Sequence, residues 1–499
     1  MTPPADSFPI EGLRGSPLAR AVLDGLRTRC TRMPENEKLC RRLLERLEFL
    51  HAHVLPLAIM DPLKRKYSDV VVRFVKMMRQ TPLLLRLANS ETHVLTVEGF
   101  QSKVDDIMAG GGLGASSMMT EWREQWDNDR AQQYPILNER VSKASERMLV
   151  NEVRGDRKLQ EALLTLQRGM NRNILSPEML QLKTQTYERV SVYANQTGLE
   201  MFEWFIPIDN VEYEEVIGST GTFGAVSRGT WKHDGIRTPV VVKHLFSELS
   251  NSSDQGFLRQ LQLWNSIPDD KHILKLYGGS HVSSPQFYVC EDAHNGNLSD
   301  FLKTNSEFFW RMFYQVAEGI QVLHDRHIVH GGLKCNNILV GDDFTAKLTD
   351  FSFSTVRSLS AALSTDAAQA ISDGIRWKPK EVLEESGAEE PQFASDIYSM
   401  GMCMIEVLTH EIPFGVDDDQ TVMEKVMNGM LPNRPEDVSD DVWTVISHLC
   451  NPIPTARPSL EQVLKEFGGR AEEERKMNPS QQSGLFGSNV AQIRPTATA

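Results

Sequence analysis

The spacing of hydrophobic residues in the first part of the chain predicts amphipathic helices. In the stretch from 36 to 54, apolar residues recur at helical spacing with Arg and Glu between them. They are Leu39, Cys40, Leu43, Leu44, Leu47, Leu50 and Val54. The segments 67–89 and 94–110 follow the same pattern less regularly, and a more polar helical pattern runs from about 118 to 197. Residues 1 to about 205 are therefore predicted to be helical.

A glycine-rich break divides this helical region. The sequence GGGLGASS, at 110–117, favours a flexible connection because glycine lacks the side chain that restricts the backbone. We interpret 1–109 as a helical bundle, 110–117 as a linker and 118–204 as helices that connect or brace.

From Trp204 onward the pattern changes to short strand-like runs, which give way after about 292 to long helical patterns. Strands first and helices later are typical of a two-lobed α+β domain, which we place at 205–470. The polar tail 471–499 lacks periodicity and is predicted to be disordered. The expected fold class is thus α+β, preceded by an all-α region.

Composition narrows the classes of partner. The formal net charge of −14 argues against binding to nucleic acid or anionic membranes, which are themselves negatively charged. The six cysteines have no metal-ligand spacing and predict reduced thiols. Neither a secretory signal nor a long apolar run is found, so we expect a cytoplasmic protein without a transmembrane segment.

A glycine-rich turn and a strand lysine suggest a phosphate site. Glycines let backbone N–H groups approach phosphates closely, although a plain hairpin turn would explain the pattern as well. The turn contributes Gly218, Gly221, Phe223, Gly224 and Val226, with Gly218 one residue further upstream than the pattern G-x-G-x-x-G-x-V expects. Lys243 lies in the β-branched run VVVKHL; alone it would be a surface lysine, but after the turn it has the spacing of a phosphate-binding one.

A second group of motifs follows in HGGLKCNN and LTDFSFS. Lys334 and Asn337 match H-x-x-L-K-x-x-N, and Asp350 matches the first position of D-F-x. Asn337 and Asp350 offer the hard oxygen ligands that Mg²⁺ prefers. The segments IRWKPKEVL, SDIYSMG and ARPS then follow in order.

Taken together, these motifs resemble a protein kinase domain of the tyrosine-kinase-like group, of the type found in oomycetes and other protists, over 211 to about 467. The helical N-terminus is weakly similar to the bundle of mixed-lineage kinase domain-like proteins. The resemblance implies ATP and Mg²⁺ as ligands, with Lys243 on the phosphates and Asn337 and Asp350 on the metal. It also implies that Glu291 and Ala293, in the hinge segment EDAH, line the nucleotide site.

The chain departs from this family where catalysis takes place. Gly332 stands in the position of the aspartate base, and Gly331 in that of the preceding arginine. Gln260 stands where a glutamate on the nearby helix should pair with Lys243, and no acid occurs between 255 and 267. Ser352 replaces the glycine of D-F-G. In WKPKE the substrate ledge is altered, although its glutamate can still pair with the arginine of ARPS.

These departures favour a pseudokinase that retains residues for ATP binding. We expect it to act as a scaffold or allosteric regulator, with protein partners bound through the helical N-terminal region. Two alternatives stay open: a low-activity Ser/Thr kinase that works without a base, and a latch that controls an N-terminal effector bundle.

Overall fold

The computed structural model describes most of the chain. The described residues are 18–53, 61–79, 81–114, 116–171, 175–219, 225–233, 236–245, 250–351, 374–384 and 393–477. The chain divides into two compact units. The first consists of Met1–Asn210 with Lys232–Ile236 and Val282–Ser284, and the second of Val211–Trp231, Arg237–His281 and Pro285–Ala499.

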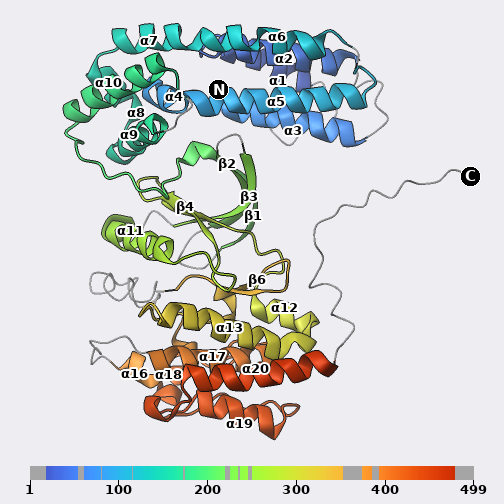
Figure 1. The fold of residues 1–499 in the computed structure, drawn as a ribbon, viewed down its shortest axis with the longest axis vertical. Coiled ribbons are helices and arrows are strands. Elements are labelled where there is room, and N and C mark those ends of the chain that lie inside the picture. Colours follow the sequence, from blue (N-terminus) through green and yellow to red (C-terminus); the bar gives the residue numbers. More distant parts are fainter. Residues whose placement is uncertain are drawn as a thin grey trace, which may run out of the picture. The chain divides into compact units, whose positions relative to one another are not determined.

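The described part of the first unit is mainly helical (Figure 1). Its helices are α1 (Leu18–Cys30), α2 (Glu37–His53), α3 (Asp61–Met77), α4 (Leu83–Ala88), α5 (Ser90–Gly110), α6 (Met118–Ala131), α7 (Gln133–Lys143), α8 (Glu146–Val153), α9 (Asp156–Met170) and α10 (Pro177–Tyr193). The apolar face predicted for 36–54 forms α2, and its residues from Leu39 to Leu50 are buried. Val54 lies outside the described residues.

Two hydrophobic cores divide these helices differently from the prediction. Trp122 and Trp126 of α6 belong to the core that α1, α2, α3 and α5 build, although α6 follows the glycine-rich connection. Conversely, Leu84 and Leu87 of α4 pack with α7, α8, α9 and α10. The predicted boundary at 110–117 is a connection between helices but does not separate the two cores. Helix α6 thus packs with helices that precede the glycine-rich connection, and α4 packs with helices that follow it.

The start of the second unit also differs from the predicted position at residue 205. Phe205 is fully buried against Leu164 of α9 and Val282, all within the first unit. The backbone N–H of Ile208 donates to the Glu161 carboxylate (3.1 Å). Residues 205–210 therefore complete the first unit, and the second begins at 211.

The second unit opens with a five-stranded antiparallel sheet in the order β1-β2-β3-β5-β4. The strands are β1 (Val211–Ser219), β2 (Ala225–His233), β3 (Ile236–His244), β4 (Leu276–Ser280) and β5 (Phe287–Cys290), and α11 (Ser250–Ser266) packs beside β4 (Figure 1). The strand-like runs read from the sequence lie in this sheet. The predicted α+β class is confirmed.

A mainly helical part follows and completes the second unit. It contains α12 (Leu298–Thr304), α13 (Phe309–His324), the small β6 (Ile338–Val340) and β7 (Ala346–Leu348) pair, α16 (Lys380–Leu383), α17 (Phe393–Thr409), α18 (Asp419–Met427), α19 (Asp440–Leu449) and α20 (Leu460–Met477). Helix α17 is buried along most of its length, which explains its nearly continuous apolar sequence.

Helix α20 corrects the predicted start of the disordered tail. The helix continues to Met477, so the first seven residues of the segment 471–499 are helical. The Glu474 carboxylate accepts hydrogen bonds from the backbone N–H groups of Trp310 and Arg311, both 2.9 Å, in the first turn of α13. A helix N-terminus attracts a carboxylate, so this polar stretch is stabilised without apolar periodicity. Residues 478–499 lie outside the described part.

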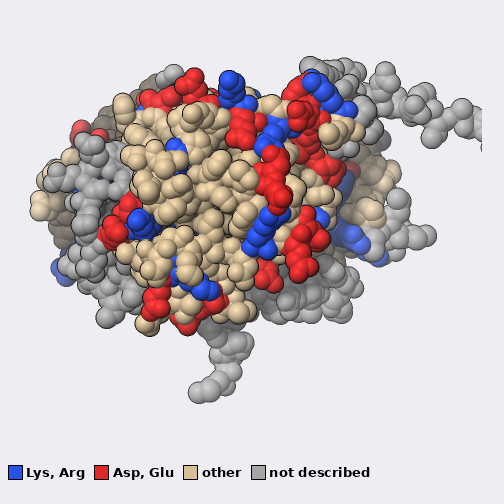
Figure 2. Space-filling model, turned by 90° about the horizontal axis from the view of Figure 1, so that it is seen from below, with Lys and Arg blue, Asp and Glu red and all other residues tan. Residues whose placement is uncertain are grey.

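The six cysteines are all free and buried, as expected for reduced thiols. Over the described ranges, no helix is both long and apolar enough to cross a lipid bilayer. On the face drawn in Figure 2, basic and acidic side chains stand next to one another and do not form separate patches.

Candidate functional site

Lys243 lies on β3, directly opposite Tyr288 on β5. Residues opposite each other in an antiparallel pair project from the same face of the sheet. Both side chains are nearly buried, with 8% of Lys243 and 3% of Tyr288 exposed. The Lys243 ammonium lies 5.8 Å from the centre of the Tyr288 ring. The lysine is thus not the solvent-facing strand residue that its position alone would suggest.

The Asp350 carboxylate accepts hydrogen bonds from both of these side chains. Asp350 follows β7, has φ at +58°, and its carboxylate faces the sheet. Lys243 Nζ contacts Asp350 Oδ2 at 2.5 Å, and the Tyr288 hydroxyl donates to Asp350 Oδ1 at 2.8 Å. Burial, together with the charge of Asp350, raises the pKa of the Tyr288 phenol well above its usual value, so the hydroxyl keeps its proton.

Gln260 of α11, which stands in the place of the helix glutamate, contacts the backbone that follows β7. Its side-chain amide donates to the backbone carbonyl of Phe351 at 2.5 Å, and the side chain is 1% exposed. The Trp264 ring, one turn further along α11, lies edge-on against both Tyr288 (5.3 Å between ring centres) and Phe351 (5.4 Å). The helix therefore holds the segment that follows β7 through its backbone and its aromatic ring.

We expect Gln260→Glu to lower the free energy of unfolding of the second unit by about 1–3 kcal/mol. The substitution removes the donor and directs a buried carboxylate at the carbonyl oxygen of Phe351. Urea unfolding of the two proteins measures the difference. A carboxylate at 260 that instead captured Lys243 would leave stability unchanged or raised, which would contradict the arrangement described here.

The loop that contains Gly332 is held by a buried carboxylate on α17. Asp396 accepts hydrogen bonds from the backbone N–H groups of His330 (2.8 Å) and Gly331 (2.9 Å), and from Nε2 of His324 (2.8 Å). Burial lowers the pKa of His330, so its neutral ring accepts from the N–H of Gly332 (3.3 Å). The path of the loop is fixed mainly through its backbone.

Gly332 leaves open the space that a side chain would fill. A Cβ atom at this position would have two neighbours within 4 Å among the described residues: the backbone oxygen of Asp350 at 3.8 Å and the side-chain nitrogen of Asn337 at 3.9 Å. Both are ordinary van der Waals distances. Neither neighbour is a carboxylate, so neither can replace an aspartate as a proton acceptor.

Lys334 and Asn337 follow Gly332 in the same loop and make protein contacts there. The Lys334 ammonium lies 5.9 Å from the centre of the Trp377 ring, and the Asn337 amide donates to the backbone oxygen of Gly332 at 2.7 Å. The nearby Glu406 carboxylate accepts from the N–H of Cys335 (3.2 Å) and from the Trp377 indole (2.8 Å). Burial raises the pKa of Glu406, which is consistent with a structural role.

The other predicted nucleotide-binding residues are only partly brought together. Gly218 on β1 pairs with Val226 on β2 in the register of the sheet. Gly221, Phe223 and Gly224 lie outside the described residues. In the hinge segment, the Glu291 carboxylate accepts a hydrogen bond from the backbone N–H of Lys275 (2.7 Å) and forms an ion pair with Lys347 (3.1 Å). The backbone oxygen of Ala293 accepts a hydrogen bond from the N–H of Gly296 (3.1 Å). The Glu291 side chain is therefore committed to protein contacts.

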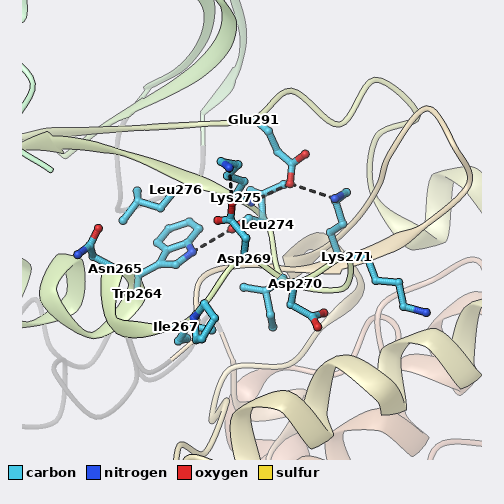
Figure 3. A pocket seen from close by; sticks show the side chains of 13 residues that line it. Trp264, Asn265, Ile267, Asp269, Asp270, Lys271, Leu274, Lys275, Leu276 and Glu291 are labelled. Atoms are coloured by element: carbon cyan, nitrogen blue, oxygen red, sulfur yellow. Dashed lines mark hydrogen bonds and ion pairs between the residues drawn. The ribbon is translucent and has the colours of Figure 1, made fainter. Parts of the chain in front are cut away.

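Glu291, in the hinge segment, also lines a pocket of about 280 Å³ at the C-terminal end of α11. Figure 3 shows the Trp264 indole together with the charged side chains of Asp269, Lys275 and Glu291, all of which line this pocket. The ammonium of Lys275 is paired with Asp269. The pocket shares Glu291 with the predicted nucleotide site and includes none of the predicted phosphate or metal residues.

The predicted metal residues have suitable chemistry but an unsuitable arrangement. Asn337 and Asp350 would offer an amide and a carboxylate oxygen, which are ligands that Mg²⁺ accepts. Both carboxylate oxygens of Asp350, however, already accept hydrogen bonds from Lys243 and Tyr288. A cation on Asp350 would have to displace one of these donors or share an oxygen with it, so the residues as arranged fit a cation poorly.

Sequence reasoning missed two residues of this site, Tyr288 and Asp396. Tyr288 could be found only by aligning β5 against β3, since its position opposite Lys243 depends on the strand register. Asp396 stands in the recognised segment SDIYSMG, but its contact with a loop more than 60 residues earlier in the chain gives no local signal.

Comparisons with known proteins agree with this fold. A family profile described as protein tyrosine and serine/threonine kinase matches residues 211–467. The putative serine/threonine-protein kinase/receptor R818 of Acanthamoeba polyphaga mimivirus is 28% identical over 280 residues, 54% of this chain and 16% of that protein. The probable serine/threonine-protein kinase drkD of Dictyostelium discoideum is 29% identical over 283 residues, 55% of this chain and 21% of its own length.

A human relative, tyrosine-protein kinase FRK, is 26% identical over 269 residues, which cover 52% of this chain and 51% of that protein. The chain therefore spans about half or less of the length of each of these three relatives. Both serine/threonine and tyrosine kinases occur among them.

Proposed function

Because the chain belongs to the protein tyrosine and serine/threonine kinase family, we propose that it is a pseudokinase within that family. It keeps the fold and several nucleotide-site residues but does not transfer phosphate at a kinase rate. Its role is that of a scaffold or allosteric regulator, with protein partners bound through the helices of the first unit. On the motifs HGGLKCNN and LTDFSFS, we place the domain in the tyrosine-kinase-like group.

The observation that carries this proposal is the empty position of the base at Gly332. Within 4 Å of the Cβ that a side chain would have there, the described residues contribute a carbonyl oxygen and an amide nitrogen. General base catalysis contributes about 10²–10⁴-fold to enzyme rates. A kinase without it loses roughly 3–5 kcal/mol of transition-state stabilisation, at 1.36 kcal/mol per tenfold change.

The pair formed by Lys243 and Asp350 supports the same conclusion. In an active kinase the lysine contacts phosphates and a helix glutamate, while the aspartate holds a metal ion. Here the two side chains bind each other, and Gln260 binds the backbone of Phe351. The alternative of a low-activity Ser/Thr kinase is not favoured, since it would need Asp350 free for the metal.

Nucleotide binding is part of the proposal and follows from the residues that remain. We assign the phosphates of the nucleotide to Lys243 and the glycine turn. We assign its adenine ring to the hinge at Glu291 and Ala293. A cytoplasmic location and an N-terminal bundle like that of mixed-lineage kinase domain-like proteins stay proposals as well.

The test is a sensitive phosphotransfer assay on the full chain, with radiolabelled ATP, Mg²⁺ and peptides that contain Ser, Thr and Tyr. We expect the wild-type protein to transfer no more phosphate than the Lys243→Ala variant, because the base is missing. Transfer by the wild-type protein at an ordinary kinase rate, lost in Lys243→Ala, would overturn the proposal.

A further inference from the structure

Two neighbouring strands each contribute one hydrogen-bond donor to the carboxylate of Asp350. Lys243 and Tyr288 stand opposite one another in the register of β3 and β5. From there the ammonium reaches Oδ2 of Asp350 and the phenol reaches Oδ1, at 2.5 Å and 2.8 Å. We call Lys243, Tyr288 and Asp350 the carboxylate clamp.

Lys243 and Tyr288 of the clamp are buried, and aromatic packing supports the clamp on the side of α11. The Tyr288 ring packs on Trp264, whose indole N–H donates to the backbone oxygen of Leu274 at 2.9 Å. Trp264 also packs on Phe351, the residue next to Asp350, and Gln260 holds the Phe351 carbonyl. Turning the carboxylate away from the sheet would break its hydrogen bonds with both Lys243 and Tyr288.

A divalent cation would compete with these donors for the same charge. Mg²⁺ binds oxygen at about 2.0–2.1 Å and usually takes one or two carboxylates with water and substrate phosphates. A cation on Asp350 would stand close to the Lys243 ammonium, and like charges at short distance repel strongly in a buried site. Gln260, in the place of the helix glutamate, has no charge with which to compensate the ammonium instead.

We propose that the carboxylate clamp withholds Asp350 from divalent cations, so that this site binds an adenine nucleotide equally well with and without Mg²⁺. Tyr288 is the positioning residue: it occupies Oδ1, the oxygen that a metal could take while Lys243 stays on Oδ2. The inference rests on the proposed nucleotide-binding role of the site. It names the form of the ligand, a nucleotide free of metal.

The experiment is calorimetric titration of the full chain with ATP, once in Mg²⁺ and once in EDTA. For the wild-type protein we expect dissociation constants that agree within about twofold. In Tyr288→Phe the hydroxyl is lost and Oδ1 is released, so Mg²⁺ should tighten ATP binding at least about tenfold, the order expected for a hydrogen bond to a charged group. The ratio of the two constants is taken within one protein and is insensitive to a general loss of stability.

Tyr277→Phe is the matched control, because it removes a phenol hydroxyl from β4 of the same sheet without touching the clamp. It should behave as the wild-type protein does. Binding by the wild-type protein that tightens tenfold or more in Mg²⁺ would overturn the inference and leave nucleotide binding standing. A Tyr288→Phe protein indifferent to Mg²⁺ would overturn the role of Tyr288. Absence of ATP binding by all three proteins, in Mg²⁺ and in EDTA, would end the nucleotide-binding proposal, and this inference with it, without bearing on the missing base.

Discussion

Gly332→Asp, introduced into the Tyr288→Phe protein, is expected to raise the rate of phosphotransfer by about 10²–10⁴-fold over Tyr288→Phe alone. The new carboxylate supplies the missing base, and the position has room for it, since its Cβ would meet neighbours no closer than 3.8 Å. The phenylalanine releases an oxygen of Asp350 for the metal. Initial rates with radiolabelled ATP and Mg²⁺ measure the effect.

The single Gly332→Asp variant should gain less, because Asp350 stays in the clamp. Gly332→Asn in the same Tyr288→Phe background is the matched control: it has the size of the aspartate but cannot accept the proton. Equal rates for the Asp and Asn proteins, with ATP bound in both, would contradict the assignment of Gly332 to the position of the base.

Arg457→Ala is expected to lower the free energy of unfolding of the second unit by about 3–5 kcal/mol, the usual effect of leaving one partner of a buried ion pair alone. The guanidinium, 1% exposed, binds both oxygens of Glu381 at 2.5 and 3.1 Å. It also donates to the backbone oxygens of Ala394 and Asn451, both 2.8 Å. All of these acceptors would lose their donor. Thermal and urea unfolding measure the loss.

The matched control is Arg475→Ala, an arginine that pairs with Glu472 at 3.1 Å on α20 but is 63% exposed. Exposed pairs of this kind contribute about 0–1 kcal/mol, so its stability should be almost unchanged. Similar losses for the two variants would show that the pair of Arg457 with Glu381 does not anchor this part of the unit.

Local patterns predicted the elements that carry the site but not the contacts between them. All but the last residue of the run VVVKHL belong to β3, and the apolar residues from Leu39 to Leu50 form the buried face of α2, because side-chain periodicity is a local property. The pairing of Glu381 with the arginine of ARPS was also expected and is confirmed. Each of these inferences needed only spacing or a familiar order of motifs.

The contacts that could not be predicted all depend on tertiary arrangement. Lys243 binds Asp350 and Gln260 binds a backbone carbonyl, and neither contact was predicted from the sequence. These contacts depend on the register of the strands and on the rotation of α11 about its axis. Neither can be deduced from the local sequence pattern. The same holds for Glu474, whose helix end is stabilised by backbone N–H groups more than 160 residues away.

The anchoring of the loop by Asp396 has a consequence for how such a protein could diverge. Its carboxylate binds the main chain of residues 330 and 331, and main-chain groups are present whatever side chains the loop carries. Charged side chains at positions 331 and 332 could therefore be replaced by glycine without a change in the path of the main chain. The fold of this loop thus does not depend on the side chains that phosphotransfer would need there.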